Sequence, residues 1–169
     1  MAGMDALSPP LQVGERVSVR LADPTHDVVG FVTALEPLTL EDRHGRSQVV
    51  AEQKVLAARR VGVSLGRDPR STPRDLLDGL AGRAGIAITA EPELHRISDL
   101  LAGRPAPAEV FAGRREWSDG GHRARVEGEW LTTDVTDPAL LIDLAWWATR
   151  QNARNIQVRR WRGSDFLRR

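Results

Sequence analysis

Residues 123–135 read RARVEGEWLTTDV, residues 137–151 read DPALLIDLAWWATRQ, and residues 155–161 read NIQVRRW. The first and last segments contain β-branched and aromatic residues in extended patterns, which predicts two strands. The middle segment starts with Asp137, a good N-cap, and Pro138 at the first helical position, and it is apolar nearly all round, which predicts a buried helix. Strand, helix and strand in this order predict a βαβ unit, whose right-handed crossover makes the strands parallel.

Two amphipathic helices are expected upstream of this unit, one after Pro73 and one over residues 91–101. Their apolar faces are formed by Leu76, Leu77 and Leu80 in the first helix, and by Leu94, Ile97, Leu100 and Leu101 in the second. Residues 108–112 and 116–117 predict a strand that leads into a turn at residues 118–121. The chain from residue 74 to residue 169 is therefore expected to form one mixed unit.

The N-terminal part has a different pattern. Val17, Val19 and Leu21 alternate with polar residues, as in a half-buried strand, and Gly45 suits the turn of a hairpin. Five short strands are expected over residues 11–62, which suits a small bent barrel because closure hides the sheet edges. Residues 63–73, rich in Gly, Pro and Ser, predict a linker. The expected fold class is α+β.

Composition narrows the possible functions. The chain has 169 residues, 41% apolar and 28% charged, with a formal net charge of +1, so it has the composition of an ordinary globular protein. It contains no cysteine, which excludes disulfides, thiolate zinc, iron–sulfur clusters and a cysteine nucleophile. The sequence has no apolar stretch long enough for a membrane span, and the first residues lack the features of a signal peptide, so we expect a cytoplasmic protein.

Several short motifs lie in residues 12–62: VGERV at 13–17, DVVG at 27–30, LEPLTL at 35–40 and RHG at 43–45. This stretch resembles the SH3-like domain that precedes the catalytic part of certain bacterial GNAT-type acetyltransferases of the histone-acetyltransferase type. The resemblance implies an SH3-like β-barrel over residues 11–62.

The strand at residues 124–131, the helix at 140–147 and the strand at 153–158 look like the C-terminal half of a GNAT domain. In that family a glycine-rich loop between strand and helix binds the pyrophosphate of acetyl-CoA. The resemblance places this loop at residues 135–139, VTDPA, which contain no glycine, a proline without an amide, and the carboxylate of Asp137. The chain also has no tyrosine, so it lacks the family's usual phenolic general acid. If acetyl-CoA were bound, the cofactor-binding residues would be Val135, Thr136, Ala139 and Leu140.

Tryptophans and arginines are concentrated near the C-terminal end of the sequence. From residue 138 to residue 169 there are seven arginines and two aspartates. The tryptophans either belong to the core or form a platform on which bases or an adenine ring stack. The possible binding surface consists of Trp130, Trp147, Arg159, Arg160, Trp161 and Arg162.

The expected function is that of a non-catalytic interaction or regulatory protein related to GNAT acetyltransferases, with a partner protein or a second copy of the chain as its ligand. No catalytic residue and no cofactor are assigned. The first alternative is an acetyl-CoA-dependent N-acetyltransferase with an atypical cofactor loop, and the second is nucleic-acid binding through the Arg-rich end. Scattered histidines predict no metal site, and no membrane partner is expected.

Overall fold

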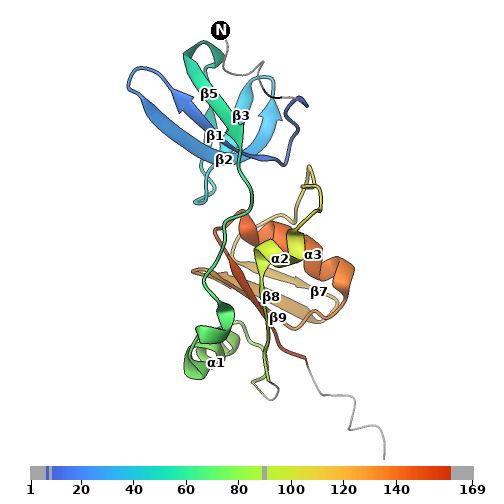
Figure 1. The fold of residues 1–169 in the computed structure, drawn as a ribbon. Helices are drawn as coiled ribbons and strands as arrows, with labels where there is room; N and C mark the ends of the chain where they lie inside the picture. Colours follow the sequence, from blue (N-terminus) through green and yellow to red (C-terminus); the bar gives the residue numbers. More distant parts are fainter. Residues whose placement is uncertain (1–6, 8, 89–90, 161–169) are drawn as a thin grey trace, which may run out of the picture. The chain divides into compact units, whose positions relative to one another are not determined.

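The computed structural model describes residues 7, 9–88 and 91–160 (Figure 1). The chain is a mixed α+β protein with two five-stranded, mostly antiparallel sheets and few helices. It divides into two compact units. Unit 1 contains Met1–Val63 and Pro105–Glu109, and unit 2 contains Ser64–Arg104 and Val110–Arg169.

Unit 1 is one antiparallel sheet with the strand order β4-β3-β2-β1-β5. Its elements are β1 (Arg16–Leu21), β2 (His26–Leu35), β3 (Leu38–Glu41), β4 (Ser47–Val49), a 3₁₀ turn at Glu52–Lys54, and β5 (Val55–Arg60). The predicted alternation is confirmed, because Val17, Val19 and Leu21 are all buried in one apolar cluster. In the described part of the chain no pairing joins β4 to β5, so the sheet is not closed into the expected barrel by hydrogen bonds.

Two glycines explain local features of unit 1. Gly45 has φ +78° in the β3–β4 hairpin, as predicted, and the Asp42 carboxylate accepts hydrogen bonds from the amides of His44 and Arg46 in that turn. Gly14 has φ +96°, and a Cβ there would lie 2.2 Å from the carbonyl oxygen of Pro107. The bare backbone of Gly14 is therefore what lets the later segment Pro105–Glu109 pack within unit 1.

Unit 2 has the strand order β6-β10-β9-β8-β7. Its elements are a 3₁₀ turn at Pro69–Ser71, α1 (Arg74–Arg83), β6 (Glu93–Arg96), α2 (Ile97–Leu101), β7 (Glu116–Asp119), β8 (His122–Glu127), β9 (Trp130–Thr133), α3 (Pro138–Thr149) and β10 (Asn155–Val158). The predicted βαβ unit is confirmed: α3 connects β9 to β10, and these two strands are parallel.

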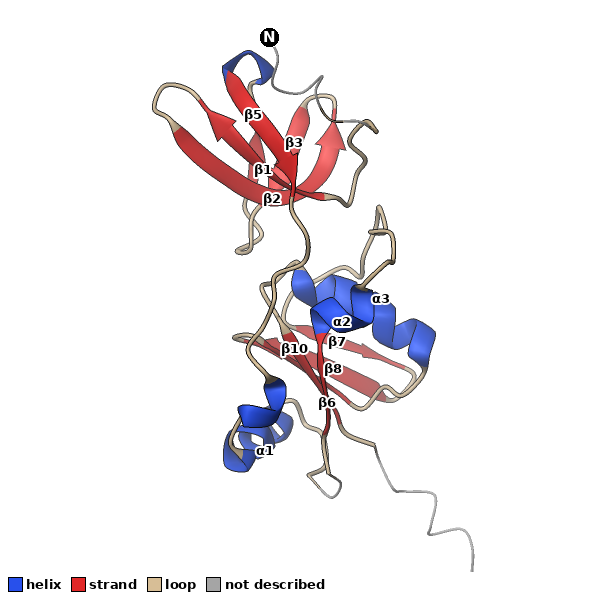
Figure 2. Ribbon diagram, in the orientation of Figure 1, coloured by secondary structure: helices blue, strands red, loops and turns tan. Residues whose placement is uncertain are grey.

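The helices of unit 2 cover both faces of its sheet (Figure 2). Leu77 and Leu80 of α1 pack on Trp130 of β9. Leu131, the next residue along β9, is fully buried on the opposite face, which α2 and α3 cover. The two parallel strands of the βαβ unit thus lie inside the sheet, and the β7–β8 hairpin forms one of its edges.

Three sequence predictions for unit 2 were wrong in detail. Residues 91–101 do not form one helix, because Glu93–Arg96 pairs as a strand with β10 and only Ile97–Leu101 is helical. Residues 108–112 contain no strand. The hairpin turn consists of Gly120 and Gly121 alone, since residues 118 and 119 still belong to β7.

The segment expected as a linker, residues 63–73, is divided between the units. Residue 63 belongs to unit 1, and residues 64–73 cluster with unit 2, where Pro69 is buried.

Candidate functional site

The junction between β9 and α3 is where the family resemblance places a cofactor loop. The Asp137 carboxylate accepts a hydrogen bond from the amide of Leu140 at 2.9 Å, and the Asp137 carbonyl accepts one from the amide of Leu141 at 2.9 Å. Pro138 has no amide hydrogen. Among the described residues, none accepts a hydrogen bond from the amide of Ala139, the remaining residue of the first three in the helix.

The other two residues expected to bind a cofactor lie just before the cap. Val135 is buried, with 1% of its surface exposed, and its amide donates to Thr133 Oγ1 at 3.1 Å. Thr136 is exposed. The junction is therefore a self-capped corner, in which the helix start is satisfied by its own aspartate rather than left open for an anion.

The expected Trp/Arg binding surface is corrected by the burial of its members. Trp130, Trp147 and Arg159 expose 8%, 1% and 1% of their surfaces. Trp147 Nε1 donates to the carbonyl of Gly113 at 3.1 Å, which satisfies its only polar atom inside unit 2. These three side chains are buried within the unit, so they do not form the exposed surface that the sequence suggested.

The arginines of this region have separate roles. Arg159 donates to Asp78 Oδ1 at 2.8 Å and to Gln157 Oε1 at 3.0 Å, so its buried guanidinium connects the end of β10 to the half-buried carboxylate of α1. Arg160 is exposed and donates to Glu93 Oε2 at 3.0 Å. Trp161 and Arg162 lie outside the described residues.

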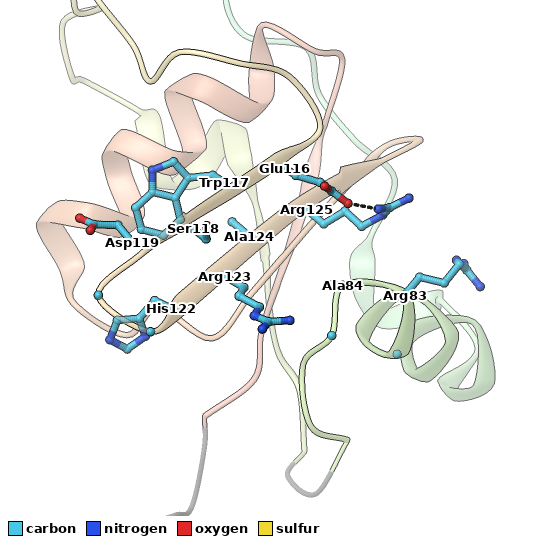
Figure 3. Close-up of a pocket in the computed structure, with 14 residues that line it drawn as sticks. Arg83, Ala84, Glu116, Trp117, Ser118, Asp119, His122, Arg123, Ala124 and Arg125 are labelled. Atoms are coloured by element: carbon cyan, nitrogen blue, oxygen red, sulfur yellow. Dashed lines mark hydrogen bonds and ion pairs between the residues drawn. The ribbon is translucent and has the colours of Figure 1, made fainter.

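A hollow of about 640 Å³ lies elsewhere in unit 2, between the C-terminal end of α1 and the β7–β8 hairpin (Figure 3). A second hollow of about 380 Å³ adjoins it and reaches Asp134 and Arg159. We call the two together the hairpin groove. The residues that line both hollows are Gly85, Gly120, Gly121, His122 and Arg123.

Ion pairs cover most of the groove face of the hairpin. Arg125 and Glu116 are cross-strand partners in the β7–β8 register and form an ion pair (Figure 3). Arg83 Nε of α1 donates to both carboxylate oxygens of Glu127, at 2.9 and 3.0 Å. The hydrogen bond from Arg83 lowers the pKa of Glu127 below its usual value, since it favours the ionised carboxylate.

Arg123 is the exception on this face. It lies on the same side of β8 as Arg125, two residues away, but its cross-strand partner is Ser118 rather than a carboxylate. Its backbone amide donates to Asp134 Oδ1 at 2.8 Å, whereas no carboxylate among the described residues pairs with its exposed guanidinium. One arginine in the centre of the groove thus has an unused donor group.

Part of this arrangement has a sequence signal. Arg123, Arg125 and Glu127 alternate along the segment HRARVE, so a strand assignment places all three on one face. The partners of these residues have no such signal, because Glu116 is brought opposite Arg125 by the hairpin register and Arg83 comes from a helix. Sequence reasoning therefore missed the groove.

Within the described residues, no helix has both the length and the apolar character needed to cross a membrane. The same part of the chain contains no cluster of three or more His, Asp or Glu side chains arranged to hold a metal ion. Comparison of the whole chain with known protein families, with curated proteins and with solved structures finds no match.

Proposed function

We propose that the chain is a non-catalytic binding protein related to GNAT acetyltransferases, with an SH3-like unit 1 and a GNAT-like unit 2 that has lost its cofactor site. The observation that carries the proposal is the hydrogen bond from the Leu140 amide to the Asp137 carboxylate. In an active enzyme of the family, this amide and its neighbours would face the pyrophosphate of acetyl-CoA. In this chain the Leu140 amide donates to the Asp137 carboxylate instead.

The topology of unit 2 supports the relation to that family. A three-stranded antiparallel meander, β7-β8-β9, is followed by α3 and by a strand parallel to β9. This is the strand, helix and strand arrangement around which GNAT proteins build their cofactor site. In unit 1, five antiparallel strands joined by tight turns support the SH3-like resemblance.

Electrostatics oppose the alternative of an active acetyltransferase. A phosphate placed at the start of α3 would lie close to the carboxylate of Asp137. Two like charges about 4 Å apart repel by about 4 kcal/mol at an effective dielectric constant of about 20. The amides that would offset this repulsion are reduced to that of Ala139, since Pro138 has none and Leu140 is already bonded.

Thermal unfolding with acetyl-CoA tests the proposal. A dissociation constant of about 0.1 mM would add about 1.4 kcal/mol of stability at about 1 mM ligand, which is a measurable rise in the melting temperature. We expect no rise in the melting temperature from acetyl-CoA binding at the α3 junction. We also expect no release of free coenzyme A in the presence of amine or peptide acceptors. Coenzyme A release, or acetyl-CoA-induced changes in the amide signals of Ala139 and Leu140, would contradict the proposal and favour the acetyltransferase.

The nucleic-acid alternative is tested in the same preparation. Arg159 is buried in an ion pair with Asp78, and Arg160 is paired with Glu93, so neither offers a free cation to a phosphate backbone. We therefore expect no salt-sensitive binding of DNA or RNA. A steep loss of binding affinity with added salt would instead indicate that phosphates are being neutralised, and it would support this alternative.

A further inference from the structure

We infer that the hairpin groove binds a small organic anion, and that a carboxylate or phosphate group of this ligand pairs with Arg123. The inference rests on the proposed binding role and names the ligand chemistry of unit 2. Three features of the groove carry it: the unpaired guanidinium, the glycines that line both hollows beside it, and the size of the hollow.

The unpaired guanidinium stands out because its neighbours are all neutralised. Arg83 is held by Glu127, and Arg125 is held by Glu116. Arg159, at the far end of the groove, is held by Asp78. Arg123 alone among the four groove arginines has no carboxylate partner in the described part of the chain. A guanidinium presents a planar fork of donors that matches a carboxylate or phosphate bidentately.

Three glycines line the groove together with Arg123. A Cβ at Gly85 would lie 2.5 Å from Arg123 Nη1, so the arginine rests directly against bare backbone at this position. Gly120 and Gly121 have no atom within 4 Å of the position where a Cβ would be, and they lie at the tip of the adjacent hairpin. Gly85, Gly120 and Gly121 therefore contribute no side chain to the part of the groove that Arg123 also lines.

The size and charge of the groove define the ligand class. About 640 Å³ is the volume of a site for a small organic molecule rather than for a single inorganic ion. The groove also contains three carboxylates, Glu116, Asp119 and Asp134, which disfavour a ligand with many negative charges. The geometry thus fits a small molecule with one anionic group, either a carboxylic acid or a phosphate monoester.

Amide NMR titrations with inorganic phosphate, phenyl phosphate and benzoate test the inference. We expect saturable shifts at Gly85, Gly120 and Gly121, with tighter binding of the larger phenyl phosphate than of inorganic phosphate. Phenyl phosphate and benzoate separate the two ligand sources, since whichever binds more tightly identifies the preferred anionic group.

Three variants make the test specific. Arg123→Gln removes the positive charge and the guanidinium fork and should weaken binding at least tenfold, in line with the strength of charge-assisted hydrogen bonds. Ser118→Asp places a carboxylate opposite Arg123 and should weaken binding to a similar degree while keeping the arginine. Arg70→Gln removes an exposed arginine that lines neither hollow and should leave affinity unchanged.

The outcomes separate this inference from the proposed function. Equal affinities of wild type and Arg123→Gln for all three anions, or the absence of shifts at the groove glycines, would overturn the inference and leave the α3 junction unaffected. An equal loss in Arg70→Gln would also overturn it, because binding would then follow the overall charge. Shifts at Ala139 and Leu140 with acetyl-CoA would instead contradict the non-catalytic role.

Discussion

Replacing Asp137 with alanine should lower the free energy of unfolding of unit 2 by about 1 kcal/mol, the usual value of an N-cap side chain. The structure gives the reason. Asp137 Oδ2 accepts the Leu140 amide at 2.9 Å, and Pro138 already leaves α3 without one amide at its first position. Without the carboxylate, the Leu140 amide would have to be satisfied by water at the exposed start of the helix, beside Pro138 and Ala139.

Urea unfolding followed by tryptophan fluorescence measures this change. The four described tryptophans, at positions 117, 130, 146 and 147, all belong to unit 2, and the sequence of unit 1 contains no tryptophan. The signal therefore reports on unit 2. With a dependence of about 1.5 kcal/mol per molar urea, typical for a domain of this size, the midpoint should fall by about 0.7 M.

Asparagine provides the matched control. Asp137→Asn removes the charge but keeps a side-chain oxygen that caps almost as well as aspartate. Its midpoint should stay close to that of wild type. A midpoint for Asp137→Ala equal to that of wild type would refute the capping role. A loss in Asp137→Asn as large as in Asp137→Ala would show that charge, rather than the hydrogen bond to the backbone, stabilises the start of α3.

Three further predictions concern other parts of the chain. Leu131→Ala, at a fully buried position of β9, should cost unit 2 about 3 kcal/mol in the same urea assay. Gly14→Ala should destabilise unit 1, because φ at Gly14 is +96° and the new Cβ would lie 2.2 Å from the carbonyl oxygen of Pro107. Gly62→Ala is the control, since no atom lies within 4 Å of the position of its new Cβ. Amide hydrogen exchange within unit 1 measures the effect of both substitutions. The hydrogen bond from Arg83 lowers the pKa of Glu127 in the folded state. The ionised carboxylate therefore stabilises unit 2 at pH values above the pKa of Glu127 in the unfolded chain. This stabilisation is lost as the pH falls through the lower pKa of the folded state. The stability difference between wild type and Glu127→Gln should therefore shrink on acidification below about pH 4, and a difference independent of pH would contradict the ion pair.

The βαβ unit could be predicted because its signals are local. Asp137 followed by Pro138 marks a helix start from two adjacent residues, and both play the predicted roles. Asn152 adopts φ +72° just beyond α3, as the residue type suggests. Each of these features depends on neighbours within a few positions, so a single sequence contains the information that they need.

Strand β6 could not be predicted because its partner is distant in the sequence. The apolar spacing of Leu94, Ile97 and Leu101 is that of a helix, and α2 does begin at Ile97. Residues 93–96 extend instead because β10 offers an unpaired edge, against which His95 lies opposite Ile156. Backbone pairing along that edge outweighs a weak local preference, and nothing within residues 91–101 specifies it.

The hairpin groove depends on the register of β7 and β8, which the two-residue turn sets. Gly120 and Gly121 both have positive φ, 55° and 84°, as a type I′ turn requires, and such a turn places Asp119 opposite His122. Counting back along β7 then places a serine opposite Arg123 and a glutamate opposite Arg125. A longer turn would shift these pairs and change which arginine is neutralised. The free guanidinium in the centre of the groove thus follows from two adjacent glycines, which links the most local feature of the hairpin to the binding chemistry that we propose for unit 2.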